Sequence, residues 1–416
     1  MSFRLLHASD LHLGQRFHDQ DRGGDERHAL DQIVAIAQRE AVDVVVIAGD
    51  VFDGPNPGTG ESQRYHRFLE QLVLEAGVGS VVVIAGNHDN AARIAGPQRL
   101  YARCQIHTRG AFRQDDDPQE LCIPLRNRSG AVVGQALAIP FLREGDVRTR
   151  SAGETSAEAA TAYVSALRTR LAQLHACLDA ALPTVVVAHA FASGGREGGG
   201  ERPIQVGNLG LVPAEALAGD CAYLALGHLH KPQAVGGREH WRYCGSLLPA
   251  GFDELSVPRE VVIAEIPDQG PAQVRRCPLS PYRDYRHLLG EPDELRQAIQ
   301  GLPEADTAAP VPWLRARARL RQPIGGLGGQ LADLAQARGW QCLGVDAEYI
   351  PDPDKEMDAA PLGNDGATVN VPDLANAEAV FARVLADHDF ADADGSLVES
   401  FRSLIERAPE LLAEEG

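Results

Sequence analysis

The chain has 416 residues, of which 44% are hydrophobic and 23% charged, and it carries a formal net charge of −19. This length suffices for two or three domains with hydrophobic cores, and no apolar run approaches the roughly 20 residues of a membrane span. The negative charge argues against a protein that coats nucleic acid with its whole surface. It does not exclude a metal-dependent enzyme, because bound cations supply positive charge locally.

The N-terminus and the cysteines bear on where the protein acts. The chain enters a strand-like run directly after its first residues, and we read no signal peptide there. Seven cysteines lie far apart and form no Cys-x-x-Cys pair, which argues against a zinc knuckle or a redox pair. We therefore expect a cytoplasmic protein with reduced cysteines and no membrane association.

Three strand–motif–helix units fill the first hundred residues. Apolar runs at 3–8, 43–48 and 80–85 predict buried strands, and helical periodicity follows the first two at about 25–40 and 61–76. This alternation predicts an α/β layered core. In such cores the ligand site lies beyond the carboxyl ends of the strands, and each of these strands ends in polar residues.

The pattern changes to short strands and turns after about residue 104. A helix is expected over about 155–181, followed by buried strands at 184–188 and 221–226. The glycine-rich segment at 194–200 is not a phosphate-binding loop, because no Gly-Lys-Ser/Thr follows it. We assign it no role.

A shift in composition near 280 divides the chain. We expect a first domain at 1–270 and a smaller α/β domain at 280–350. A polar linker is predicted at 351–374, followed by amphipathic C-terminal helices at 375–416.

Side chains of metal-ligand type follow five of the predicted strands. They are Asp10, His12, Asp50, Asn87, His88, His189, His228 and His230. A mixed oxygen and nitrogen set suits manganese, iron or zinc, and the absence of sulfur disfavours a structural zinc site. If two cations bind, one carboxylate must bridge them, and Asp50 is the natural bridge because it stands alone at the end of a central strand.

Each of these residues also has an ordinary structural explanation. A single histidine at a strand end is more often a hydrogen-bonded structural residue, and Asp10 or Asp50 could cap the following helix. The pattern points to metal only because all five motifs occur together. Taken jointly, they predict a two-metal site.

Two metal ions would support hydrolysis of a phosphate ester. They activate water, hold a phosphate oxygen and stabilise charge on the attacking and leaving oxygens. A histidine that is not a ligand can then stabilise the transition state or protonate the leaving group. His88 is the best candidate for this role, and Asp89 is the candidate to orient it.

The motifs and their order resemble those of the calcineurin-like metallophosphoesterase superfamily. They are Asp10-x-His12, Gly49-Asp50, Gly86-Asn87-His88-Asp89, His189 and Gly227-His228-x-His230. Residues 8–14, 49–53, 227–233 and 243–249 are, more closely, similar to the SbcD family of bacterial nuclease subunits, which act in repair of DNA double-strand breaks. The resemblance is specific over 3–267 and looser beyond.

The resemblance implies a ligand set for each metal. One metal would be held by Asp10, His12, Asp50 and His230. The other would be held by Asp50, Asn87, His189 and His228. His88 matches the catalytic histidine of the family, which is not a ligand, and the implied cofactors are two divalent ions, with Mn²⁺ as the expected metal.

The resemblance also implies a fold, substrates and partners. The fold would be a two-sheet α/β sandwich flanked by helices, with a small α/β capping domain that helps seat DNA. The activity would be that of a 3′–5′ exonuclease on double-stranded ends and an endonuclease on hairpins and single strands. The partner would be an SbcC-type SMC-like ATPase, held by the C-terminal helices in a heterotetramer that contains a homodimer of this subunit.

Two other functions fit parts of the pattern. A small-molecule phosphodiesterase or protein phosphatase of the same superfamily is one, although protein phosphatases typically carry an arginine shortly after Gly-Asp and residues 49–55 have none. The other is a scaffold that binds DNA ends and has little activity alone. The intact ligand set argues against it.

One strand of the second domain alternates arginines with apolar residues. The arginines are Arg315, Arg317, Arg319 and Arg321. Alternation places them on one face, where they either contact the phosphate backbone of DNA without reading bases or form a solvated face paired with carboxylates. The sequence leaves both interpretations open.

Overall fold

The structure is a computed structural model that describes residues 2–113, 116–149, 153–195, 211–350 and 401. The chain divides into two compact units, Met1–Ile350 and Pro351–Gly416, and all described residues except 401 belong to the first. The predicted linker and C-terminal helices lie outside the described residues, as does most of the glycine-rich segment. Within the described residues, no helix is long and apolar enough to cross a membrane.

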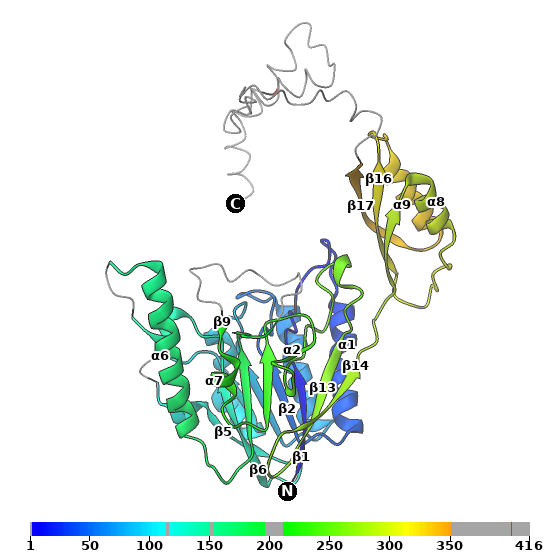
Figure 1. Cartoon of the computed structure of the whole chain (residues 1–416). Coiled ribbons are helices and arrows are strands. Elements are labelled where there is room, and N and C mark those ends of the chain that lie inside the picture. The colour runs from blue at the N-terminus through cyan, green and yellow to red at the C-terminus, as the bar shows by residue number, and fades with distance from the viewer. Residues whose placement is uncertain (1, 114–115, 150–152, 196–210, 351–400, 402–416) are drawn as a thin grey trace, which may run out of the picture. The chain divides into compact units, whose positions relative to one another are not determined.

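Two six-stranded sheets form the centre of this unit (Figure 1). The first has the strand order β14-β13-β1-β2-β3-β4. Its strands are β1 (Phe3–Ala8), β2 (Val44–Ala48), β3 (Ser80–Ile84), β4 (Ile106–Arg109), β13 (Glu260–Ile266) and β14 (Gln273–Pro278). Strands β1 to β4 are parallel, whereas β13 pairs antiparallel with β1 and β14.

The second sheet has the order β11-β12-β10-β7-β6-β5. Its strands are β5 (Cys122–Arg126), β6 (Val132–Ile139), β7 (Thr184–His189), β10 (Tyr223–Gly227), β11 (Gln233–Val235) and β12 (Arg238–Tyr243). The four central strands β6, β7, β10 and β12 are parallel. A separate two-stranded sheet consists of β8 (Phe191–Ala192) and β9 (Leu211–Val212).

Helices cover the outer faces of the paired sheets. The longer ones are α1 (Gly23–Arg39), α2 (Thr59–Leu74) and α6 (Ser156–Ala176). The shorter ones are α3 (Ala91–Ala95), α4 (Gln98–Tyr101), α5 (Glu144–Val147), α7 (Ala214–Ala218) and the 3-10 turns η1 (Ala102–Cys104), η2 (Pro118–Leu121) and η3 (Phe252–Glu254). In Figure 1, α6 runs along one side of the sheets and α1 along the other.

The apolar strands fold this way because both of their faces are covered. Every residue of β2 and β3 is buried, which is typical of parallel strands enclosed between layers. One cluster of buried side chains joins the facing sides of the two sheets with α1 and α2. A second joins the outer face of the second sheet to α6 and α7. The predicted two-sheet sandwich flanked by helices is confirmed.

A third sheet lies in residues 280–350, which we call the cap. Its parallel strands are β15 (Tyr285–Gly290), β16 (Trp313–Leu320) and β17 (Gln341–Tyr349), with helices α8 (Pro292–Gln300) and α9 (Leu327–Ala337). The apolar side chains of β16 pack with both helices in a core of their own. Because the compact unit runs without a break to Ile350, the domain boundary near 270–280 stays a prediction.

Aromatic residues pack between the cap and two segments outside the sheets, the loop after β1 and the turn η3. Phe17, Phe252 and Trp313 form a small buried cluster, which we call the junction cluster. The rings of Phe17 and Trp313 stack with centroids 5.7 Å apart. Beside them the buried Asp25 carboxylate accepts hydrogen bonds from Arg283 at 2.7 Å and from Tyr285 at 2.7 Å.

Candidate metal centre

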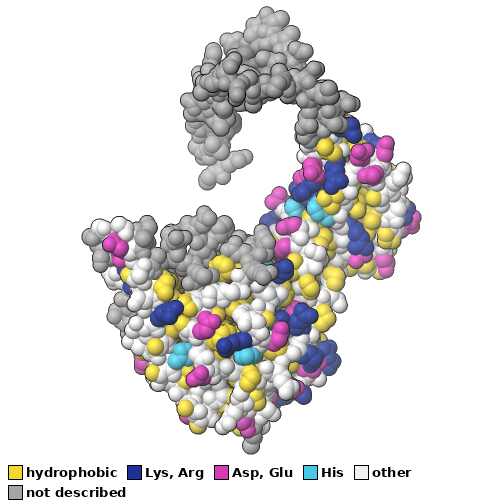
Figure 2. Space-filling model, viewed as in Figure 1, with side chains coloured by type: hydrophobic (Ala, Val, Ile, Leu, Met, Phe, Trp, Pro, Cys, Tyr) yellow, Lys and Arg dark blue, Asp and Glu magenta, His cyan; other side chains and the backbone are white. Residues whose placement is uncertain are grey.

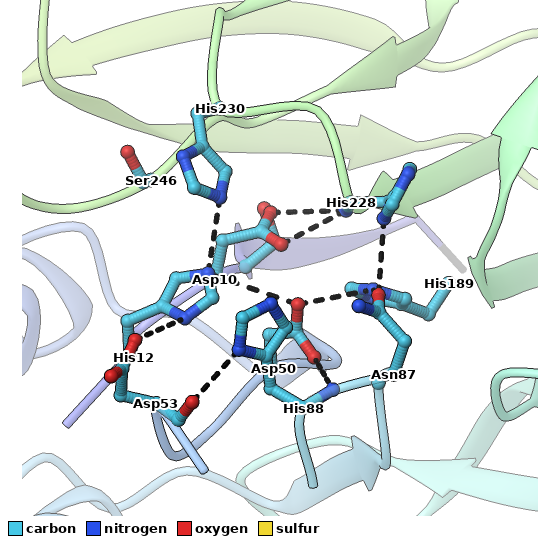
Figure 3. A network of polar contacts seen from close by, with 12 residues as sticks. Asp10, His12, Asp50, Asp53, Asn87, His88, His189, His228, His230 and Ser246 are labelled. Atoms are coloured by element: carbon cyan, nitrogen blue, oxygen red, sulfur yellow. Dashed lines mark hydrogen bonds and ion pairs between the residues drawn. The ribbon is translucent and has the colours of Figure 1, made fainter. Parts of the chain in front are cut away.

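The predicted ligands converge at one point between the two sheets (Figure 3). They lie at or just beyond the carboxyl ends of β1, β2 and β3 in the first sheet and of β7 and β10 in the second. Parallel strands deliver their carboxyl ends to the same edge. This is why residues more than 200 positions apart meet here.

The backbone is sharply bent where the ligands leave the strands. Asp10, His12, Asp50 and His228 have φ of 50°, 43°, 47° and 108°, a left-handed range that few non-glycine residues adopt. Such conformations cost on the order of 1–3 kcal/mol each and cluster at functional sites. Hydrogen bonds hold the bends, for example from the Asp10 N–H to the Gly49 carbonyl at 3.0 Å.

Two glycines in the motifs are required by close packing. A Cβ on Gly86 would lie 2.1 Å from Asp50 Oδ1, and one on Gly49 would lie 2.2 Å from His189 Nδ1. Contacts this short are not tolerated, so these positions admit no side chain. The glycines therefore let the ligand-bearing turns approach one another.

The first group of donors contains His12, His230 and Asp10. The Nε2 atoms of the two histidines face each other at 3.1 Å, and one carboxylate oxygen of Asp10 lies within 4.8 Å of a nitrogen of each. All three residues are buried. Two ring nitrogens and a carboxylate directed at one point suit a divalent cation.

The second group contains Asn87, His189 and His228. His189 Nδ1 lies 2.9 Å from the Ala48 carbonyl, which can only accept, so Nδ1 carries the proton and Nε2 presents a lone pair in the neutral ring. That Nε2 lies 2.9 Å from Asn87 Oδ1, and His228 Nδ1 lies 3.1 Å from the same oxygen. An amide oxygen and two ring nitrogens gathered at one point suit a divalent cation.

Asp50 lies between the two groups. Its Oδ2 is 3.4 Å from His189 Nε2 and 3.7 Å from His12 Nε2. Its Oδ1 accepts a hydrogen bond from the His88 backbone N–H at 2.9 Å. One oxygen is thus within reach of both groups, as a bridging ligand must be.

Burial and charge shift the titration of this cluster. Burial raises the pKa of Asp10 to about 6. Burial also opposes the charged form of Asp50, yet the neighbouring His189 and His12 hold the pKa of that carboxyl well below its usual range. Burial would lower the pKa of His189, but the Asp50 charge raises it to about 9. The carboxylates here attract positive charge, whether a proton or a metal ion.

His88 lies against the first group but is held differently from the ligands. Its Nδ1 is 2.8 Å from the Asp53 backbone carbonyl, so Nδ1 donates and Nε2 is the ring nitrogen that can take part in proton transfer. Its ring meets the ring of His12 edge to face, with centroids 4.8 Å apart. Sequence reasoning missed the carbonyl contact, since a backbone carbonyl has no sequence signature.

Asp89 makes other contacts than the one we predicted. Its carboxylate accepts hydrogen bonds from the backbone N–H groups of Gly86 at 2.9 Å and of Val51 and Phe52 at 3.0 Å each. Among the described residues the orienting contact on the ring of His88 therefore comes from the Asp53 carbonyl rather than from Asp89. Asp89 ties together the two turns that follow β2 and β3.

Of the four arginines predicted to contact DNA, Arg315, Arg317 and Arg319 lie on one face of β16, and Arg321 follows the end of the strand. Arg315 forms a two-pronged contact with Asp346, at 2.7 and 2.8 Å, and Arg319 lies 3.7 Å from Glu348. Figure 2 accordingly shows acidic and basic side chains interspersed over the cap. The carboxylate pairing that we considered thus occurs for two of the four arginines, and their role in DNA binding stays a prediction.

Comparison with known proteins identifies the family. Residues 3–232 match the model of the calcineurin-like phosphoesterases, and the D subunit of nuclease SbcCD from Rhodobacter capsulatus is 35% identical over 284 residues, 66% of this chain and 69% of that protein. The chain belongs to the SbcD group of the calcineurin-like phosphoesterase family. It is therefore a metal-dependent phosphodiesterase, and its buried donor set is consistent with divalent cations.

Other SbcD relatives match to a similar extent. The D subunit of nuclease SbcCD from Escherichia coli K12 is 36% identical over 60% of this chain and 62% of that protein. The D subunit from Bacillus subtilis is 33% identical over 63% of this chain and 66% of that protein. The alignments thus span about two thirds of each relative. Among solved structures, TT1561 of Thermus thermophilus matches 67% of this chain at 14% identity with a TM-score of 0.35, which is too weak a likeness to add to this conclusion.

Proposed function

We propose that this chain is the nuclease subunit of a DNA-end-processing complex. It would act as a 3′–5′ exonuclease on double-stranded ends and as an endonuclease on hairpins and single strands. The observation that carries the proposal is the position of Asp50 Oδ2, within 3.7 Å of a histidine nitrogen from each donor group. This arrangement supports two cations sharing one carboxylate, as phosphodiester hydrolysis by two metals requires.

Each donor group would hold one divalent ion. The first ion takes Asp10, His12, Asp50 and His230. The second takes Asp50, Asn87, His189 and His228. The balance of imidazole and oxygen donors favours Mn²⁺ over Mg²⁺. When bound, the two ions supply Lewis acidity that activates water and neutralises charge on the phosphate.

His88 is proposed as the residue that moves a proton at the leaving oxygen. Because Nδ1 is engaged with the Asp53 carbonyl, Nε2 is the atom that would donate to the departing 3′ or 5′ oxygen once the ring is protonated. The half-buried position of His88, next to the buried ligand His12, supports access to substrate on one side only.

The cap is proposed to contact the DNA backbone. Arg317 lies on the same face of β16 as Arg315 and Arg319 but makes no ion pair within the described residues. Its charge is available for a phosphate, and such a contact would position DNA without reading its sequence.

The relatives are named as subunits of a two-protein nuclease. We infer by analogy that an SbcC-type SMC-like ATPase is the partner, in a heterotetramer with two copies of this chain. Because the relatives come from bacteria, whose DNA lies in the cytoplasm, we propose a cytoplasmic location.

The deciding experiment is a cleavage assay on a blunt duplex and on a hairpin, with Mn²⁺ or Mg²⁺, in the presence and absence of the ATPase partner. We expect Mn²⁺-dependent cleavage of both substrates, with 3′ ends shortened on the duplex. A chain that binds two Mn²⁺ ions yet cuts neither substrate with its partner would establish the scaffold function instead.

A further inference from the structure

A buried glutamate lies behind His230, outside the predicted ligand set. Glu254, in the turn η3, is 6% exposed, and its Oε1 lies 3.9 Å from His230 Nδ1. Within the described part of the chain, Oε1 accepts no hydrogen bond. A buried carboxylate oxygen without a donor is costly, and the His230 ring is the polar group that it faces.

The other carboxylate oxygen is firmly held. Glu254 Oε2 accepts hydrogen bonds from Arg259 at 2.8 Å and from the Ala250 backbone N–H at 2.9 Å. Arg259 is itself largely buried, and its second terminal nitrogen donates to Ser246 Oγ at 2.6 Å. These contacts fix the carboxylate in place and leave Oε1 directed at His230.

The contacts close into a ring around His230. The Ser246 backbone N–H donates to the His230 carbonyl at 3.1 Å, so the same arginine that holds Glu254 also holds the residue bonded to the His230 backbone. Figure 3 shows Ser246 beside His230, on the side away from His12. Both the ring and the backbone of His230 are therefore supported from behind.

The direction of the His230 ring defines what Glu254 can do. His230 Nε2 faces His12 Nε2 at 3.1 Å, so Nε2 is the nitrogen available to a metal, and the neutral ring then carries its proton on Nδ1. Glu254 Oε1 lies 3.9 Å from that nitrogen, an electrostatic contact longer than a hydrogen bond. Carboxylates placed in this way behind ligating histidines fix the tautomer and orientation of the ring and strengthen metal binding.

We propose that Glu254 is a positioning residue that orients His230 for one of the two metal ions, through an electrostatic contact with the Nδ1–H of that ring that closes to a hydrogen bond when the ring binds the metal. Arg259 and Ser246 support it. This inference rests on the proposed two-metal function and adds to it a residue that the strand-end motifs do not contain. In this proposal Glu254 is not a metal ligand and acts only through His230.

The test is a titration of the full chain with Mn²⁺, in which the EPR signal of free Mn²⁺ measures how much of the metal is bound. We expect two ions on the wild-type chain. Glu254→Ala should weaken one of them about 10- to 100-fold and leave the other unchanged. Glu254→Gln should weaken it less, because the amide oxygen still accepts a proton from Nδ1. Glu260→Gln is the matched control, a buried glutamate near Arg242, and should change neither ion.

A second measurement separates positioning from general stability. In a His230→Asn background, Glu254→Gln should produce no further loss of Mn²⁺ affinity, because the ring on which it acts is gone. An equal loss of Mn²⁺ affinity from Glu254→Gln in the wild-type and His230→Asn backgrounds would overturn the inference and leave the proposed function intact. The same holds if Glu254→Ala binds both Mn²⁺ ions with wild-type affinity. If Glu254→Ala does not fold, the isosteric Gln variant carries the same test. A wild-type chain that binds fewer than two Mn²⁺ ions would overturn the proposed function and this inference with it.

Discussion

The strand ends of the two large sheets and the open face of the cap sheet both carry charged residues, but these residues are buried at the strand ends and partly exposed on the cap. At the strand ends, Asp10, Asp50 and His189 are at most 1% exposed, and carboxylate oxygens and ring nitrogens of the ligand set lie close together. On the cap, Arg315 and Arg319 face solvent in part and are matched by carboxylates of the neighbouring strand β17.

The difference shows which charges predict a ligand. Carboxylates and histidine nitrogens buried together around one point are costly unless a cation or protons partner them, so the strand ends are the stronger evidence for metal binding. Exposed ion pairs contribute little to stability and need no external partner. The cap face is therefore weaker evidence for DNA binding, and Arg317, which makes no ion pair in the described part of the chain, is the informative position.

The largest effect is expected from Asp50→Asn. A neutral amide cannot bridge two cations as the carboxylate does, so both Mn²⁺ ions and all detectable cleavage should be lost. Metal analysis after gel filtration and the hairpin assay measure this, and Asp31→Asn on the exposed face of α1 serves as a control without effect. A variant that retains two ions would break the contrast between the strand ends and the cap.

His88→Gln should separate catalysis from metal binding. Removal of a residue that moves a proton lowers cleavage by roughly 10²- to 10⁴-fold, while Mn²⁺ content and melting temperature stay at wild-type values because the ring is not a proposed ligand. The measurement is single-turnover cleavage of a hairpin. Loss of one Mn²⁺ ion would instead make His88 a ligand.

A third prediction concerns His7, a core histidine away from the metal site. Burial, together with the charge of Arg242, lowers the pKa of His7 to about 3, whereas the unfolded chain titrates near 6.5. Between these values only the unfolded chain takes up the proton, so stability falls as the pH falls. The loss from this group between pH 7 and pH 5 is about 2 kcal/mol.

Urea unfolding at the two pH values measures this loss, and His7→Gln should show a smaller decrease than wild type. Equal decreases in both proteins would mean that burial does not govern the titration of His7. The contrast between buried and exposed polar groups would then lose part of its basis.

The smallest effect is expected on the cap. Arg317→Ala should weaken DNA binding severalfold and reduce the slope of log affinity against log salt by about 0.9, the value for one phosphate contact on duplex DNA. Arg319→Ala, which removes an arginine already paired with Glu348, should have less effect on the slope. Fluorescence anisotropy at several salt concentrations decides the matter, and equal slopes for both variants would favour a purely solvated face.

Much of the fold and of the candidate metal site could be predicted from the sequence, because the patterns that specify them lie within short stretches of the chain. The apolar runs that become β1, β2 and β3 are continuous, and each is followed at once by its polar motif. Helix α6 was expected to reach residue 181 but ends at Ala176. The apolar spacing continues past its end into a turn in which the Leu182 N–H donates to the Asp179 carbonyl.

Other features are invisible in the sequence because they depend on tertiary contacts. Asp89 looked like a partner of its neighbour His88, yet it binds backbone groups of Val51 and Phe52, more than 35 positions away. Asp346 pairs with Arg315 across strands 31 positions apart. Contacts with backbone groups and pairing between neighbouring strands cannot be read from residue types, so only the structure reveals them.

The turn η3 contacts both the cap and the proposed metal site. Phe252, in the junction cluster with Trp313 of the cap, and Glu254, behind His230, are two residues apart in the same turn. Free-energy coupling between two binding events is reciprocal. If seating of DNA on the cap shifts this turn and tightens the hold on a cation by some factor, that cation must tighten the hold on DNA by the same factor. Metal binding and DNA binding would then be thermodynamically coupled, and the three-residue turn η3 would carry that coupling.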